Sequence, residues 1–196
     1  MIGVLECEKV RIDAREARAR LGQYSDDISP ELSARTLACE SVLRGAARVS
    51  YSYLTLPVSY SDGCAVSIGD ITLHSRDLCR ALRGADFASV FAVTLGAGVD
   101  RLLARQSRIS QSDHFITDAL ASAMAEGAAD AVCDLILSGA PSVVRFSPGY
   151  GDLSIDVQPL VLKLLQAEKI GITLTHSGLM VPTKTITAIF GIEVRK

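Results

Sequence analysis

The sequence has 196 residues, 48% of them hydrophobic, so it can bury one substantial core in a single domain or two closely packed lobes. Its 20 basic and 22 acidic residues leave a formal net charge of −2, which argues against a nucleic-acid partner. The five cysteines form no C-x-x-C pair, which argues against a disulfide framework or a zinc knuckle. There is no basic signal region and no apolar stretch near the ~18 residues that a membrane span needs, so we expect a cytoplasmic protein.

The first half of the chain is expected to alternate between helices and strands. Capping residues and terminal glycines mark the helices, and β-branched and aromatic residues beside turn sequences mark the strands. In chain order we predict a strand or arm at 4–10, helices at 13–21 and 29–45, strands at 48–59 and 65–73 joined by a turn at 61–63, a short helix that Ser75 caps and Gly84 ends, and a buried strand at 87–95.

The second half contains the longest periodic segment, a helix from Ser112 to Ser138 with one continuous apolar stripe. The stripe consists of Phe115, Ile116, Ala119, Leu120, Ala123, Met124, Val132, Leu135 and Ile136. The other predicted elements are a helix from about residue 99, a helix at 156–169 and strands at 172–175 and 185–192. The pattern favours a mixed α+β domain with a mainly antiparallel sheet.

Residues 94–98, Thr-Leu-Gly-Ala-Gly, follow a predicted strand and open a helix, as a phosphate-cradling turn would. The third glycine of the dinucleotide fingerprint is absent, and Arg101 stands where a small residue is needed. We therefore interpret the segment as a strand-to-helix turn.

Metal-dependent and hydrolytic chemistry have no support in the sequence. The three histidines, His74, His114 and His176, are far apart and lack a second ligand at metal-binding spacing. No serine lies in a Gly-x-Ser-x-Gly elbow. We identify no metal site and no independent catalytic residue.

Acidic residues form a ridge on the long predicted helix, at spacings of four or eight residues: Asp118, Glu126, Asp130 and Asp134. Like charges at this spacing mildly destabilise an isolated helix. The ridge is either a solvated face or a surface that meets a cation, such as an arginine of the next segment or a bound ammonium or sulfonium group.

The most specific indication of a ligand-binding turn is the segment Arg145-Phe146-Ser147-Pro148-Gly149-Tyr150-Gly151-Asp152. An arginine can grip a carboxylate through two parallel hydrogen bonds, and a Pro-Gly turn lets main-chain groups approach a ligand. The same residues could form a well-made turn that ends in a packed tyrosine.

Residues 145–191 continue with Leu164-Leu165, Gly171 to Thr175, Ser177, Met180, Pro182 and a terminal strand at 185–191. In this order they resemble the activation domain of cobalamin-dependent methionine synthase, with its R-x-x-x-G-Y motif followed by G-[MIV]-x-L-T-E-S-x-x-M-x-P. The sequence departs from the pattern at His176, Val181, Ala188 and Phe190. The resemblance implies one activation-domain-like domain over 1–196, with a helix and strand lobe at 1–95 and a ligand-binding part at 96–196.

The resemblance also implies a cleft that holds S-adenosylmethionine. Arg145 matches the arginine that grips the methionine carboxylate, and Pro148 and Gly149 match the turn whose backbone lines the cofactor. Tyr150 matches the tyrosine near the docked corrin. Glu126 would meet the amino or sulfonium group, and Phe190 matches a cofactor-binding aromatic that is often tyrosine.

The implied function is that of a stand-alone reactivation subunit. It would support reductive methylation of cob(II)alamin to methylcobalamin, with cobalamin carried by the cobalamin-binding module of methionine synthase. The electron would come from a flavodoxin or ferredoxin, and no nucleic acid or membrane is implied. The alternative is a non-catalytic regulatory or binding module with the same fold that serves another corrinoid protein.

Overall fold

The computed structural model describes residues 1–23, 29–61, 64–138 and 144–193. Six strands form an antiparallel sheet: β1 (Ile2–Leu5), β2 (Val49–Ser61), β3 (Ala65–Ile68), β4 (Ile71–His74), β5 (Phe87–Thr94) and β8 (Thr185–Ile192). Their order is β4-β3-β2-β5-β8, and β1 pairs with the first residues of β2. A second, small sheet joins β6 (Thr173–Leu174) to β7 (Met180–Val181).

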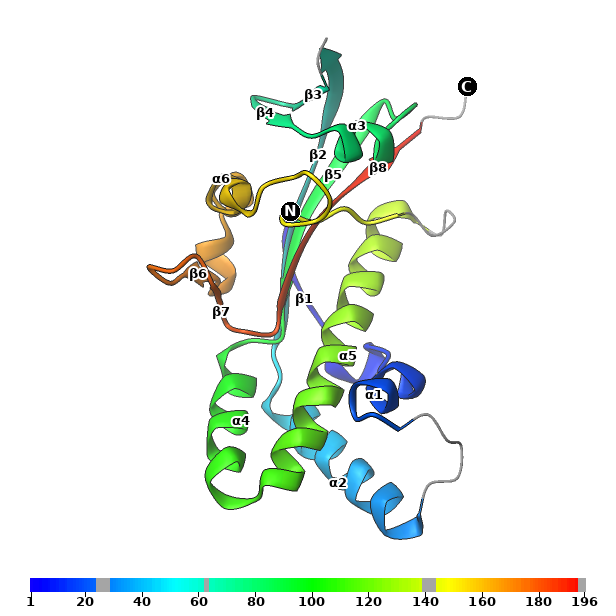
Figure 1. Cartoon of the computed structure of the whole chain (residues 1–196), viewed down its shortest axis with the longest axis vertical. Coiled ribbons are helices and arrows are strands. Elements are labelled where there is room, and N and C mark those ends of the chain that lie inside the picture. Colours follow the sequence, from blue (N-terminus) through cyan, green and yellow to red (C-terminus); the bar gives the residue numbers. More distant parts are fainter. Residues whose placement is uncertain (24–28, 62–63, 139–143, 194–196) are drawn as a thin grey trace.

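Helices cover both faces of the large sheet (Figure 1). One face packs against α1 (Ala14–Arg20), α2 (Pro30–Ala46), α4 (Ala97–Ile109) and α5 (Gln111–Leu137), and the other against α3 (Arg76–Ala81) and α6 (Gln158–Leu164). Three short 3-10 helices complete the described chain: η1 (Cys7–Lys9), η2 (Ile155–Val157) and η3 (Ala167–Ile170). The predicted α+β class with a mainly antiparallel sheet is confirmed.

Side-chain caps begin several helices where the sequence predicts them. Asp13 accepts hydrogen bonds from the N–H groups of Arg15 and Glu16 at 2.8 and 3.1 Å. Ser29 accepts one from Leu32 N at 3.2 Å, and Ser75 accepts one from Leu78 N at 2.9 Å. Each oxygen satisfies an N–H group that the helix itself leaves without a partner, which fixes where the helix starts.

Two predicted elements are divided in the structure. The strand predicted at 65–73 is the hairpin of β3 and β4, because Gly69 has a φ of 57° and turns the chain there. The helix predicted at 156–169 becomes η2, α6 and η3, because Gln166 adopts a left-handed conformation after α6. The two-residue strand β7 was not predicted, since two residues carry no readable alternation.

Helix α5 buries mainly small side chains against the sheet and the helices around it. The predicted apolar stripe is wrong at two positions, since the side chains of Phe115 and Leu135 are 60% and 40% exposed. At Gly127, an added Cβ would lie 1.9 Å from the carbonyl oxygen of Arg11. The N-terminal segment therefore crosses α5 in backbone contact.

Among the described residues, none of the helices combines the length and the apolar character required to cross a membrane.

The crossing at Gly127 predicts a large difference between two glycine substitutions. Gly127→Ala should lower the free energy of unfolding by about 1–3 kcal/mol, since the methyl group must push the Arg11 backbone away. Gly45→Ala, near the end of α2 with open space around it, should leave stability unchanged or raise it by up to about 1 kcal/mol. Urea unfolding of both variants measures the difference. Equal stabilities would contradict the close crossing.

Candidate ligand-binding site

The segment after α5 crosses the edge of the sheet at β8. Phe146 and Ile189 exchange two backbone hydrogen bonds, each 2.8 Å long, so Phe146 pairs with the outer edge of the last strand. Figure 1 shows the chain passing here from the α5 side of the sheet to the α6 side. Arg145 therefore lies on the α5 side, and the residues that follow Phe146 lead away from it.

The turn at 147–153 is closed by its own backbone. Tyr150 N donates to Ser147 O at 3.0 Å, and Gly149 N donates to Leu153 O at 2.8 Å. Gly149 has a φ of 89°, a conformation that favours glycine, and Pro148 is buried. Tyr150 is 58% exposed, and its ring meets Phe146 edge-on with 6.3 Å between the ring centroids. The loop thus presents a tyrosine at the surface on a hydrogen-bonded turn.

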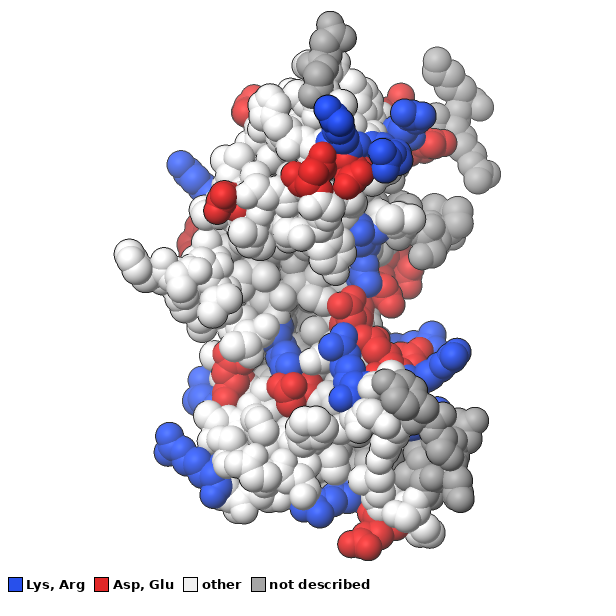
Figure 2. Space-filling view, viewed as in Figure 1, with Lys and Arg blue, Asp and Glu red and all other residues white. Residues whose placement is uncertain are grey.

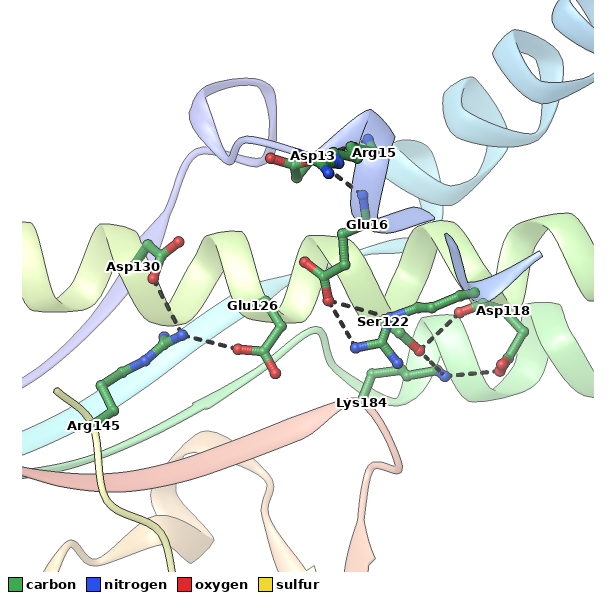
Figure 3. Close-up of polar contacts among 10 residues, drawn as sticks. Asp13, Arg15, Glu16, Asp118, Ser122, Glu126, Asp130, Arg145 and Lys184 are labelled. Atoms are coloured by element: carbon green, nitrogen blue, oxygen red, sulfur yellow. Dashed lines mark hydrogen bonds and ion pairs between the residues drawn. The ribbon is translucent and has the colours of Figure 1, made fainter. Parts of the chain in front are cut away.

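Arg145 reaches from this loop to the acidic ridge of α5. Its Nη2 lies 2.9 Å from Glu126 Oε2 and 3.2 Å from Asp130 Oδ1. Figure 3 shows the guanidinium pointing at the helix between these two carboxylates. The arginine side chain is 22% exposed, less than either acid, so the ion pair with Glu126 is partly shielded from solvent.

One nitrogen of this guanidinium remains uncommitted. Arg145 Nη1 is buried, and it has no hydrogen-bond acceptor in the part of the chain that the structure describes. A buried donor without an acceptor is costly, so such a group in a partly open site is suited to binding an anionic oxygen. A carboxylate is the natural complement of this donor.

A second cation meets the same ridge about two turns of helix closer to the start of α5. Lys184 Nζ lies 2.8 Å from Asp118 Oδ1 and donates to Ser122 Oγ at 2.8 Å. Glu126 therefore stands between Lys184 and Arg145 along the ridge (Figure 3). In Figure 2, acidic and basic side chains alternate in a band across the middle of the molecule. Of the two readings of the ridge, contact with a cation holds for Asp118, Glu126 and Asp130, whereas Asp134 is exposed as on a solvated face.

A cavity of about 350 Å³ lies beside the Arg145 ion pair. It is lined by Lys9, Arg11, Gly127, Asp130, Ala131, Cys133, Asp134 and Arg145. Its walls thus carry both signs of charge, as a site for a zwitterion would. Burial raises the pKa of the Cys133 thiol to about 11, against a smaller lowering effect of Arg145. Cys133 is therefore a neutral wall of the cavity and not a nucleophile at neutral pH.

The six predicted site residues occupy three places in the structure. Arg145 and Glu126 are in contact, and Pro148, Gly149 and Tyr150 form the turn that follows Arg145. Phe190 is fully buried in β8, where its ring packs edge-on against Phe91. We therefore assign Phe190 to the core beneath the site. Among the described residues, no group of three or more His, Cys, Asp or Glu side chains could hold a metal ion.

The contacts of three residues at the site were not anticipated from the sequence. Lys184 and Ser122 extend the polar ridge, and Asp152 ties the loop to α3. Ser122 falls on the four-residue spacing of the ridge and could have been found from it. Lys184 and Asp152 gave no such signal, since their partners lie far away in the sequence.

The residues 94–98 form the predicted strand-to-helix turn. Gly96 precedes α4 with a φ of 84°, and a Cβ on Gly98 would lie 2.1 Å from Ala46 O. The two glycines thus allow α4 to pack closely against the end of α2.

Taken together, a six-stranded antiparallel sheet between two helical layers and a loop along its β8 edge define the class of the fold. Comparisons with protein-family models and with curated proteins found no match. Among solved structures, the MetH reactivation domain bound to AdoHcy is similar, with a TM-score of 0.78 and 17% sequence identity. The match covers 100% of this chain and 79% of that chain. The chain thus has the fold of a methionine synthase reactivation domain, which confirms the resemblance at the level of the fold.

The environment of Cys133 predicts slow alkylation in the folded protein. With a pKa of about 11, only about one thiol in a thousand is ionised at pH 8, and the thiolate is the reactive form. Iodoacetamide at pH 8 should therefore leave Cys133 of the folded protein unmodified during a reaction time that is long enough to label Cys133 in urea. Mass spectrometry of the peptide that contains Cys133 measures this. Rapid labelling of the native protein would contradict a buried, neutral thiol.

Proposed function

We propose that this chain is an S-adenosylmethionine-binding reactivation subunit for cobalamin-dependent methionine synthase, which supports the reductive methylation of cob(II)alamin. The observation that carries the proposal is the Arg145 guanidinium, which is held against α5 by Glu126 and keeps one buried nitrogen without an acceptor. The fold, shared with a reactivation domain that was solved with AdoHcy, supports the same assignment.

The charges around Arg145 suit an α-amino acid with an additional cation. Arg145 Nη1 has no acceptor among the described residues, and a small movement of the guanidinium would let it donate a charge-assisted hydrogen bond to the carboxylate of the ligand. Glu126 is 37% exposed and has one oxygen, Oε1, outside its bond to Arg145. In this proposal Glu126 meets the amino or sulfonium group, and the ion pair with Arg145 keeps both side chains in place before the ligand binds.

The proposed reaction requires the protein to position the methyl donor relative to the cobalamin, and it requires no acid or base catalysis. Bound S-adenosylmethionine would supply the activated methyl group, and a cobalamin on the partner's cobalamin-binding module would receive it. Pro148 and Gly149 form the turn that would line the cofactor, and the exposed Tyr150 would face the corrin. The electron donor in this scheme is a flavodoxin or ferredoxin that acts on the assembled complex.

Loss of the guanidinium should weaken ligand binding strongly. Calorimetry with S-adenosylmethionine should give an affinity about 10- to 100-fold lower for Arg145→Ala than for the wild type, as expected for a hydrogen bond to a charged group. Arg145→Lys should fall between the two, since it keeps the charge and loses the fork. Equal affinities of wild type and Arg145→Ala would refute the assigned grip.

Arg35→Ala is the matched control for this series. Arg35 also forms an ion pair with an acid at α5, 2.7 Å from Asp113, and it contacts no residue of the 145–152 loop in the bonds described. The Arg35→Ala variant should therefore bind S-adenosylmethionine like the wild type. A similar loss of affinity in both variants would point to a general effect on folding.

Recovery of enzyme turnover tests the functional half of the proposal. The protein is mixed with inactive methionine synthase that lacks its own activation domain, together with S-adenosylmethionine and a reductant. We expect turnover to return with the wild type and not with Arg145→Ala. Binding of S-adenosylmethionine without any recovery would favour a regulatory module that serves another corrinoid protein.

A further inference from the structure

Asp152 connects the candidate ligand loop to a distant part of the sheet. Its carboxylate accepts hydrogen bonds from the Ser75 hydroxyl and from the N–H groups of Arg76 and Asp77, the latter two at 2.8 and 3.2 Å. These three donors surround the start of α3, on the opposite face of the sheet from α5. The loop is thus fixed at its far end by a group that is 75 residues or more away in the sequence.

Helix α3 also has a cap within its own segment, in addition to the contacts with Asp152. Ser75 Oγ accepts the hydrogen bond of Leu78 N at 2.9 Å, as a helix N-cap does. The same hydroxyl donates its proton to Asp152. Ser75 therefore stands between the helix and the loop, and the bond it donates serves to hold the loop.

The neighbour of Asp152 shows how closely the loop approaches α3. Gly151 has a φ of 52°, and a Cβ at this position would lie 2.3 Å from Asp77 Oδ2. The hydroxyl of Ser75, followed by the backbone donors of Arg76 and Asp77, also holds the pKa of the Asp152 carboxyl below its usual range. The carboxylate is accordingly ionised at neutral pH and keeps its full capacity as an acceptor.

The loop from Arg145 to Asp152 is therefore anchored at three places. Arg145 is paired with α5, Phe146 with the edge of β8, and Asp152 with the start of α3. The turn that carries Gly149 and Tyr150 lies between the second and third anchors, closed by the bond between Gly149 N and Leu153 O. The buried side chain of Leu153 also holds this end of the turn, and the bonds of Asp152 fix the direction in which the turn meets α3.

We propose that Asp152 is a positioning residue, which holds the Gly149-Tyr150 turn in its ligand-binding geometry through Ser75 and the N-terminus of α3. It does not touch the ligand itself. This role rests on the proposed function for its effect on S-adenosylmethionine, but the restraint on the turn is independent of any ligand.

Hydrogen exchange tests the restraint without a ligand. In Asp152→Ala, the amides of Gly149, Tyr150 and Leu153 should exchange about 3- to 30-fold faster than in the wild type, as loss of a capping carboxylate predicts. Exchange in α5 and β5 should not change. Asp152→Asn should give an intermediate rate, because it keeps one acceptor oxygen. Unchanged exchange in the turn, or faster exchange throughout the protein, would overturn the proposal.

Calorimetry then measures the consequence for binding. Asp152→Ala should bind S-adenosylmethionine about tenfold more weakly at a temperature at which circular dichroism shows it to be folded, and Ser75→Thr, which keeps the hydroxyl, should bind like the wild type. Asp156→Ala is the matched control, since Asp156 lies in η2 shortly after this loop and its side chain bonds only to Ser154 in the contacts described. Equal losses in Asp152→Ala and Asp156→Ala would overturn a specific role of Asp152.

The two hypotheses can fail separately. If the wild type does not bind S-adenosylmethionine, the proposed function fails, and hydrogen exchange alone decides the role of Asp152. If the wild type binds and Asp152→Ala binds equally well, the positioning role fails while the proposed function stands.

Discussion

The backbone contact between Arg11 and Gly127 sets the position of α5, on which the candidate site depends. A crossing this close leaves the helix no freedom to rotate or slide, since any residue other than glycine at the contact would strike the carbonyl group. Because the ridge residues repeat every four positions, fixing the rotation at Gly127 fixes the direction of Glu126 and Asp130 as well. The ridge consequently faces the loop that carries Arg145.

The edge strand β8 imposes a second constraint. An open edge exposes unpaired N–H and C=O groups, and proteins usually cover such edges. Here Phe146 pairs with Ile189 and covers part of the edge. Since Arg145 precedes this pair and the turn follows it, one short segment both protects the sheet and places the candidate ligand-binding groups. A change that releases Phe146 would therefore disturb the fold and the site together.

Local signals in the sequence predicted much of the fold. The caps at Asp13, Ser29 and Ser75 and the buried run of β5 depend on neighbouring residues, and they lie as predicted. The two divided elements depend on the backbone conformation of single residues, Gly69 and Gln166. Gln166 adopts a left-handed conformation that is not typical of glutamine, so the break after α6 could not be predicted from the residue type.

The site shows the same division between local and distant information. The loop motif identified Arg145 and the turn, and the four-residue spacing identified the acidic ridge. That Arg145 meets Glu126, 19 residues earlier in the chain, follows only from the packing of the loop across β8. Phe190 was placed by alignment with the motif alone. The register of β8 decides its direction: Ile189 packs into the cluster that contains α6, so the next residue faces the opposite cluster, which contains α5.

The balance of charge at the ion pair bears on which ligands the proposed site can accept. At the ion pair itself one guanidinium meets two carboxylates, so this point of the ridge carries net negative charge, while Lys9 and Arg11 line the cavity beside it. A ligand with only a carboxylate would gain one hydrogen bond from Arg145 and would be repelled by Glu126 and Asp130. A ligand that has a carboxylate and also carries cationic groups would be attracted by Arg145 through the carboxylate and by the acidic residues through the cationic groups. In the proposed function, S-adenosylmethionine has this pattern through its amino and sulfonium groups, and a product that has lost the sulfonium charge would be held less firmly.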